Sequence, residues 1–268
     1  MSPAHHGRVL VIAGSDSGGG AGIQADIKTI TALGGYAATA ITAITVQNTL
    51  GVTGVMPVPV DVIEAQGRAV LDDIGADAIK TGMLGDVATV EVVAKMIDHG
   101  RRLPAVIDPV MIAKGGAPLL PPRAVDAVTS LLVPRAELLT PNAPEAAALT
   151  GLAAETTDDL RRAGEKLLAM GAKAVLMKGG HVAGARVVDV LMTASGEVTF
   201  DNERIETRHT HGTGCTLASA CATGLAQGLS MHQAVERART YVRQAMLDAP
   251  GFGAGHGPLD HAWPVRKR

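Results

Sequence analysis

The stretch "HTHGTGCTLASACATGLAQG" at residues 209–228 contains a turn, 212–214, that ends in a cysteine and leads into small residues. These small residues predict a helix over 214–228. The first backbone N–H groups of a helix have no partner inside it and lie at the positive end of its dipole, an arrangement that binds anions and suits phosphate. Cys215 would lie at the mouth of this site, where a thiol loses its proton more easily. The motif predicts a phosphate site with a reactive thiol beside it.

A second glycine-rich turn, "AGSDSGGGAGIQADIKT" at 13–29, joins a strand to a helix and places Asp16 and Asp26 on either side. Residues 20–25 match the dinucleotide pattern G-x-G-x-x-A, which also needs an acid about 20 positions later, where the next strand ends. That strand ends in Gln47-Asn48, so a dinucleotide fold is not favoured. A Walker A loop needs a Gly-Lys dipeptide, which the chain lacks. A flexible turn remains open for the outer glycines.

Asn142 and Glu145 in "TPNAPEAAALTG" are three residues apart at the start of a predicted helix. They form either a capping box or part of a network around hydrated Mg²⁺ and phosphate, since hard oxygen ligands suit that ion. Both interpretations stay open.

Asp108 in "AVIDPVMIAKGG" ends an apolar strand, where an acid at the carboxyl end points to a functional role. Lys114 and Lys178 each precede two glycines, and each is either a phosphate-side lysine or a solvated loop residue. His209, His211 and Cys215 could be read as zinc ligands. No fourth ligand is evident, so zinc is not favoured. Cys221, in mid-helix, is interpreted as a small buried hydrophobe.

Apolar, β-branched runs alternate with longer helical patterns along the chain. This alternation predicts βαβ units and a mostly parallel sheet with helices on both faces. Ligands bind such sheets beyond the carboxyl ends of the strands, and the motifs above lie there. The predicted strands cover 8–14, 38–47, 51–58, 77–82, 105–110, 137–142, 173–180, 186–192 and 197–207. The predicted helices cover 22–33, 60–74, 87–99, 122–132, 143–150, 157–170, 214–228 and 231–248.

The composition limits the possible partners. Aromatic residues make up 2% of the 268 residues and the net charge is −2, which argues against nucleic-acid binding. No stretch approaches the length of about 20 apolar residues that spans a bilayer, and the N-terminus lacks a secretory apolar region. The two cysteines are six positions apart and unlike a disulfide pair. We therefore expect a soluble cytoplasmic protein with no nucleic-acid or membrane partner.

Nearly from end to end, the chain resembles the bacterial hydroxymethylpyrimidine/phosphomethylpyrimidine kinases of thiamine biosynthesis, within the ribokinase-like superfamily. The resemblance rests on "IAGSDSGGGAGIQADIKT", "AITAITVQNT", "IKTGMLGD", "VIDPVM", "LLTPNAPEA", "VLMKGGH" and "HTHGTGCTLASA", in this order. It implies an α/β fold, a three-layer αβα sandwich with no separate lid domain. It also implies a homodimer, a small pyrimidine as substrate, ATP as co-substrate and Mg²⁺ as cofactor.

The resemblance also assigns roles to residues. Gly212, Thr213 and Gly214 would form the anion hole for the transferring phosphoryl group, and Cys215 would be the base for the substrate hydroxymethyl group. A helix N-terminus lowers a thiol pKa from about 8.5 by a unit or more, so Cys215 is expected to ionise readily.

The pyrimidine and the nucleotide would be held by two further sets of residues. Asp26 and Gln47 would bind the ring nitrogens and amino group, beside Gly14, with Met83 and Val110 packing on the ring. Asp108, Asn142 and Glu145 would organise Mg²⁺ around ATP, with Asp108 and Glu145 reaching the metal through water. Lys178 would lie near the nucleotide phosphates.

We expect a flexible N-terminus over 1–7, one kinase domain over 8–250 and a C-terminal tail over 251–268. The expected reaction phosphorylates 4-amino-5-hydroxymethyl-2-methylpyrimidine, and then its monophosphate. The alternatives are a pyridoxal or pyridoxine kinase of the same superfamily and a non-catalytic sensor that binds the pyrimidine.

Overall fold

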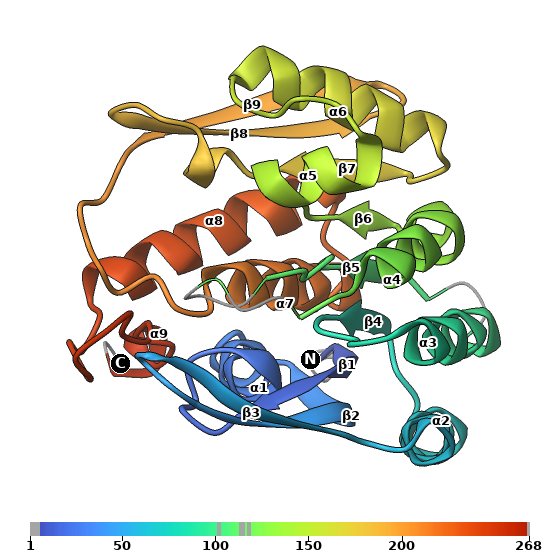
Figure 1. The fold of residues 1–268 in the computed structure, drawn as a ribbon. Coiled ribbons are helices and arrows are strands. Elements are labelled where there is room, and N and C mark those ends of the chain that lie inside the picture. The colour runs from blue at the N-terminus through green and yellow to red at the C-terminus, as the bar shows by residue number, and fades with distance from the viewer. Residues whose placement is uncertain (1–5, 101–102, 113–115, 117–118, 267–268) are drawn as a thin grey trace, which may run out of the picture.

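The computed structural model describes residues 6–100, 103–112, 116 and 119–266. Nine strands form one sheet in the order β3-β2-β1-β4-β5-β6-β7-β8-β9 (Figure 1). Strands β2, β1, β4, β5, β6 and β7 are parallel neighbours, whereas β3, β8 and β9 pair antiparallel at the two edges. The prediction of a mostly parallel sheet is confirmed.

The strands are β1 (Arg8–Asp16), β2 (Tyr36–Asn48), β3 (Gly51–Pro57), β4 (Ala78–Thr81), β5 (Ala105–Ile107), β6 (Leu138–Leu139), β7 (Ala174–Met177), β8 (Arg186–Thr193) and β9 (Gly196–Glu203). Each overlaps a predicted strand. Strands β5, β6 and β7 end three residues earlier than predicted, and β9 ends four residues earlier. After β5 and β6 the backbone leaves the sheet and carries polar residues into the space beyond it.

The helices are α1 (Gly22–Ala32), α2 (Val60–Ala69), α3 (Val87–His99), α4 (Pro122–Ala127), α5 (Ala143–Thr150), α6 (Thr157–Ala169), α7 (Thr213–Ala226), α8 (Met231–Leu247) and α9 (Trp263–Arg266). The predicted helices over 60–74 and 122–132 each close with a π-helical turn, Val70–Ile74 and Val128–Leu132. Side-chain caps set several starts: Asp86 begins α3, Thr156 begins α6 and Ser230 begins α8.

Two apolar cores, one on each face of the sheet, hold the three layers together. Alternate side chains of a strand point to opposite faces, so Leu10 and Ile12 of β1 pack with α2 to α6, while Val9 and Val11 pack with α1, α7 and α8. All four are fully buried. This double burial explains why the central strands read as continuous apolar runs, and it confirms the predicted αβα sandwich.

The carboxyl ends of β1, β4, β5, β6 and β7 meet at one edge of the sheet because these strands are parallel. The segments that follow them carry the glycine-rich turn, Met83, Asp108, Asn142 and Lys178. The N-terminus of α7 lies at the same edge (Figure 1). None of the helices in the described part of the chain is long and apolar enough to cross a membrane.

Candidate active site

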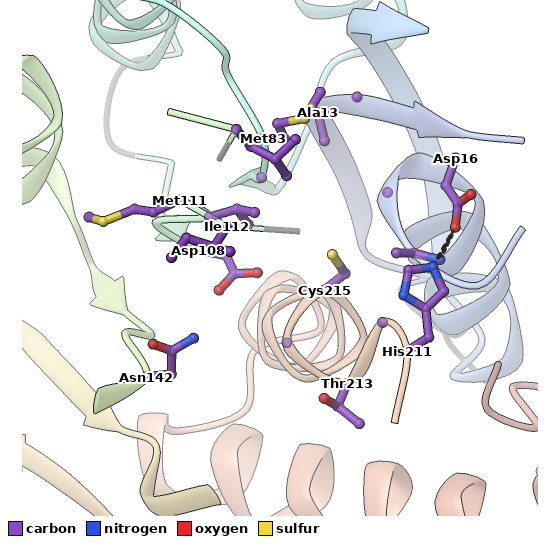
Figure 2. A pocket seen from close by; sticks show the side chains of 18 of the residues that line it. Ala13, Asp16, Met83, Asp108, Met111, Ile112, Asn142, His211, Thr213 and Cys215 are labelled. Atoms are coloured by element: carbon purple, nitrogen blue, oxygen red, sulfur yellow. Dashed lines mark hydrogen bonds and ion pairs between the residues drawn. The ribbon is translucent and has the colours of Figure 1, made fainter. Parts of the chain in front are cut away.

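A cavity of about 380 Å³ opens at this edge. Figure 2 shows Cys215 facing into it, with Asp108 on one side and His211 on the other. Twelve of the thirteen residues predicted for the site line it: Gly14, Gln47, Met83, Asp108, Val110, Asn142, Glu145, Lys178, Gly212, Thr213, Gly214 and Cys215. Asp26 does not line it. Lys114 lies outside the described residues.

The turn before α7 requires a glycine at its first position. Gly212 caps the helix with φ +83°, and a Cβ there would lie 1.8 Å from the carbonyl oxygen of Gly20. Its own carbonyl accepts the N–H of Thr216 at 2.9 Å, which closes the first helical turn. The Thr213 N–H donates to Thr210 O at 3.4 Å, and the N–H groups of Gly214 and Cys215 have no acceptor within the helix. These residues line the cavity, an arrangement that suits an anion.

A second cavity, of about 530 Å³, lies on the other side of this turn. Thr213, Gly214, Asn142 and Lys178 line both cavities. The lining of the second cavity includes the cationic side chains of Arg204, Arg208, Arg239 and Arg243 together with the acidic side chains of Asp189, Glu203 and Glu206, and Arg239 is paired with Asp189 at 2.7 Å. The N-terminus of α7 therefore stands where two ligand-sized spaces meet.

A lysine and two carboxylates gather beside the turn. Lys178 Nζ lies 3.1 Å from Asp108 Oδ1 and 3.8 Å from Glu145 Oε2. A Cβ on Gly214 would lie 3.3 Å from Lys178 Nζ and 3.6 Å from Asp108 Oδ2, so the helix start and this cluster are in contact. Burial by itself would lower the pKa of Lys178, but Asp108 and Glu145 raise it well above its usual value. The lysine is therefore a fixed positive charge.

Asn142 and Glu145 form the capping box of α5. The Asn142 side chain accepts the N–H of Glu145 at 2.9 Å, and Glu145 accepts the N–H of Asn142 at 2.7 Å. Burial raises the pKa of Glu145 to about 7, an effect that Lys178 opposes and Asp108 reinforces. The capping interpretation is therefore correct, and the same carboxyl also faces the cavity.

Cys215 differs from expectation in its acidity. Burial raises its pKa to about 11, although Lys80 and the backbone N–H of Gly22 pull it down. The prediction of a lowered pKa is wrong here because loss of water around the thiolate outweighs the helix terminus. The thiol is therefore neutral at neutral pH.

The far end of the first cavity is suited to a flat ring. Met83, Met111 and Ile112 line it, and Gly14 leaves room for Met83, whose Cε would lie 2.5 Å from a Cβ at that position. The Gln47 side chain accepts a hydrogen bond from the Thr45 hydroxyl at 3.1 Å. Apolar walls with one oriented amide can hold a heteroaromatic ring and select its polar edge.

Asp16 and His211 form a pair that the sequence motifs pointed to only indirectly. Asp16 Oδ2 lies 2.8 Å from His211 Nε2 (Figure 2), and the carboxylate accepts the N–H groups of Gly18, Gly20 and Ala21. Burial would raise the pKa of Asp16, but these hydrogen bonds and His211 lower it below its usual value. Asp16 therefore shapes the glycine-rich turn and ties it to the residue before Gly212.

Asp26 lies beneath the cavity floor. Its side chain is fully buried in an ion pair with Lys80, and Ser219 donates to it. Both carboxylate oxygens accept hydrogen bonds from these partners, so in this structure Asp26 does not itself contact the cavity. A lysine inside the buried strand "DAIKTG" was the sequence signal for this pair, because such a charge needs a partner.

The segment after residue 250 packs against the site. His256 N–H donates to Thr49 O at 2.8 Å, Gly257 O accepts the N–H of His211 at 3.2 Å, and His261 Nε2 lies 3.0 Å from the Thr216 hydroxyl. Leu259, Asp260 and His261 are buried. This segment, predicted as a C-terminal tail and assigned no role from the sequence, contacts both sides of the Gly212 turn.

The two carboxylates of Asp108 and Glu145 are the type and number of ligands that suit a hydrated divalent cation. Both supply hard oxygen atoms, and Asp108 Oδ2 faces the Gly214 side, whereas the contacts with Lys178 and Thr140 go to Oδ1. In the part of the chain that the structure describes, no cluster of three or more His, Cys, Asp or Glu side chains could hold a metal. Two carboxylates suit Mg²⁺ that keeps most of its water.

Comparison with known proteins gives a consistent result. The family model described as phosphomethylpyrimidine kinase matches residues 16–260. The chain is 49% identical to the hydroxymethylpyrimidine/phosphomethylpyrimidine kinase of Streptomyces coelicolor, covering 96% of this chain and 95% of that one. It is 48% identical to the Bacillus subtilis protein of the same name, with 95% and 94% covered. The structure of an ADP complex of Bacillus subtilis pyridoxal kinase superposes with a TM-score of 0.91 at 37% identity, covering 98% of this chain and all of that one.

Proposed function

The chain belongs to the phosphomethylpyrimidine kinase family, and from this premise we propose the reaction that it catalyses. It transfers the γ-phosphoryl group of ATP to 4-amino-5-hydroxymethyl-2-methylpyrimidine, and then transfers a second one to the monophosphate, in thiamine biosynthesis. The observation that carries this proposal is the anion turn Gly212–Gly214 at the junction of two cavities.

The first cavity binds the acceptor. The pyrimidine ring lies against Met83 and Val110, and the Gln47 amide selects its polar edge. This placement turns the hydroxymethyl group toward Cys215. The second cavity binds ATP, whose phosphates lie near its arginines and Lys178. The γ-phosphoryl group then reaches the Gly212–Gly214 turn.

Phosphoryl transfer needs positioning and charge stabilisation more than activation of the nucleophile. The N-terminal N–H groups of α7 and the Lys178 ammonium stabilise the negative charge on the transferring group. The acceptor oxygen forms a bond to phosphorus as the bond to the leaving oxygen of ADP breaks. The hydroxyl proton goes to Cys215 Sγ in its thiolate form, which is the minor form at neutral pH because burial raises the pKa of the thiol. In the second step the acceptor is a phosphate oxygen that is already ionised.

Asp108 and Glu145 would hold Mg²⁺ through water, beside the phosphates. When bound, the ion neutralises phosphate charge. Lys178 lies between the two carboxylates and keeps them from repelling each other.

A homodimer and a cytoplasmic location belong to the same proposal. The β2–β3 ribbon exposes a row of large apolar side chains, namely Tyr36, Ile44, Val46, Leu50, Val55 and Met56. A second copy would cover them, and Val46→Lys is expected to yield a monomer in light scattering. Both cysteines are free thiols, which suits a reducing compartment.

ADP release with Mg²⁺ and ATP tests the reaction. The acceptors are the hydroxymethylpyrimidine, its monophosphate and pyridoxal, each offered to the wild type, to Cys215→Ala and to Cys221→Ala. Cys221 is fully buried in the same helix and outside the cavity, so it controls for loss of a thiol. We expect turnover of both pyrimidines, lost only in Cys215→Ala. Turnover of pyridoxal alone would indicate a vitamin B6 kinase, and binding without turnover would indicate a sensor.

A further inference from the structure

An ion pair lies sealed beneath the floor of the acceptor cavity. Lys80 and Asp26 are both fully buried, and Lys80 Nζ lies 2.9 and 3.0 Å from the two carboxylate oxygens of Asp26. The Ser219 hydroxyl donates to the same carboxylate at 2.6 Å. None of the three residues lines either cavity. The reaction described above gives this group no part.

The fold directs this group toward Cys215. Alternate residues of β4 share a face, and Ala78 packs in the core formed with α1, α7 and α8, so Lys80 enters the same layer. On α7, Ser219 is four residues after Cys215 and on the same side of the helix. A Cβ on Gly82, which lines the cavity, would lie 3.1 Å from Lys80 Nζ. Only a thin layer of backbone separates the ammonium from the acceptor space.

Charged groups face the Cys215 sulfur from several elements. Lys80 on β4 lowers the pKa of the thiol, while Asp26 on α1 and Asp108 after β5 raise it, and the Gly22 N–H lowers it. Lys178, after β7, also interacts with Cys215. Of the two members of the pair, the Lys80 ammonium is the one that favours ionisation of the thiol.

We propose that Lys80 is a positioning residue for phosphoryl transfer, whose ammonium, held by Asp26 and Ser219, stabilises negative charge on Cys215 from beneath the cavity floor. The proposal rests on the proposed function, which needs Cys215 to take a proton while burial opposes its ionisation. Stability alone does not explain the pair, because apolar residues of similar volume often stabilise a core equally well.

The test measures ionisation of Cys215 directly. In a Cys221→Ala background Cys215 is the single cysteine, since the chain has two. Its rate of alkylation by iodoacetamide between pH 7 and 10 follows the thiolate fraction. We expect Lys80→Met to lower this rate about 10-fold or more at each pH, and Asp26→Asn to raise it about 10-fold. A change of about 10-fold in the thiolate fraction corresponds to a shift of about one unit in the pKa of Cys215. Thr223→Val, which removes a buried hydroxyl one turn further along α7, should leave the rate unchanged.

The opposite changes in alkylation rate expected for Lys80→Met and Asp26→Asn distinguish an electrostatic role of the pair from a packing role. A structural role would move both variants in the same direction, and that result, or an unchanged rate in Lys80→Met, would overturn the proposal. If Lys80→Met does not fold, Lys80→Met with Asp26→Leu removes both charges, and its alkylation is expected to be slower than that of Asp26→Asn, which lacks the carboxylate but keeps the ammonium. Kinase activity is assayed separately: a wild type without ADP release would refute the proposed function, while the alkylation rates would still report on Lys80.

Discussion

Two lysine–aspartate pairs lie beside the first turns of α7, and they differ most in their access to solvent. Lys80 and Asp26 are sealed, at 0% exposure each, whereas the Lys178 side chain is 13% exposed and borders both cavities. The sealed pair makes a double contact near 3 Å. The open pair makes one contact at 3.1 Å and shares its lysine with Glu145.

This difference separates two uses of the same chemical groups. A sealed ammonium cannot touch a ligand, so it can act only as a fixed field on its neighbours. An ammonium at the border of a cavity can exchange its carboxylate contacts for a phosphate. Under the proposed mechanism, Lys80 would act on Cys215 from beneath the cavity floor, and Lys178 would act on the transferring phosphoryl group from the border of the two cavities.

The largest expected effect is on folding stability. Lys80→Met leaves a buried carboxylate without its partner, which costs about 3 to 5 kcal/mol. Lys178→Met leaves Asp108 and Glu145 beside open cavities, where water can solvate them, so a loss of about 1 kcal/mol is expected. Urea unfolding at neutral pH measures both. Equal losses would show that the two pairs do not differ as described.

The second prediction concerns turnover, and here the larger effect is expected at the open pair and not at the sealed one. Lys178→Met removes a cation from the transferring phosphoryl group and should lower kcat about 10²- to 10³-fold. Lys173→Met is the matched control, since Lys173 precedes the same strand β7 and pairs with Glu137 at the surface. Steady-state ADP release measures both variants. A comparable loss in the control would place the effect in the strand and not in the site.

The third prediction concerns the turn between the pairs. Gly212→Ala adds both a left-handed alanine and a clash with Gly20 O at 1.8 Å, whereas Gly228→Ala, also at φ +83°, meets nothing within 4 Å. Gly228→Ala should cost about 1 kcal/mol from backbone strain alone and leave kcat unchanged. Gly212→Ala should cost about 2 kcal/mol more and abolish turnover. Thermal unfolding and ADP release distinguish them, and equal effects would mean that the close approach to Gly20 is unimportant.

The sequence predicted the open pair better than the sealed one. Asp108 and Lys178 each follow a strand at its carboxyl end, and parallel strands must bring such ends together. The partner of Lys80 is 54 positions away on a helix, and no periodicity or spacing relates the two. Asp26 was placed at the substrate by the resemblance to the kinase family, and the rotation of α1 that buries it depends on packing against α7.

The remaining differences have a similar cause. In the described part of the chain, the nine strands and helices α1 to α8 follow from apolar periodicity, but the shortness of β6, at two residues, depends on how its neighbours pair. The contacts of His256, Gly257 and His261 with the site join residues far apart in the chain. Local patterns carry no information about such contacts, and the acidity of Cys215 shows that a helix terminus can be outweighed by burial.

The fourth prediction is a pH dependence of stability at the open pair. Burial raises the pKa of Glu145 to about 7 in the folded protein, above the usual value of about 4.3 in the unfolded chain. The folded state therefore binds more protons than the unfolded chain between these two pKa values. The stability that the protonated Glu145 carboxyl contributes is present at low pH and is lost as the pH rises through 7. Glu145→Gln keeps an oxygen for the Asn142 N–H but cannot ionise. Its free energy of unfolding should exceed that of the wild type increasingly from pH 4.5 to 7, by about 3 to 4 kcal/mol at the end, since each pKa unit is worth about 1.4 kcal/mol, and the difference should stay constant above that. Glu137→Gln, which removes a surface carboxylate, controls for net charge. If the difference instead shrinks with rising pH, Lys178 holds Glu145 ionised, and the open pair resembles the sealed one more closely than its exposure indicates.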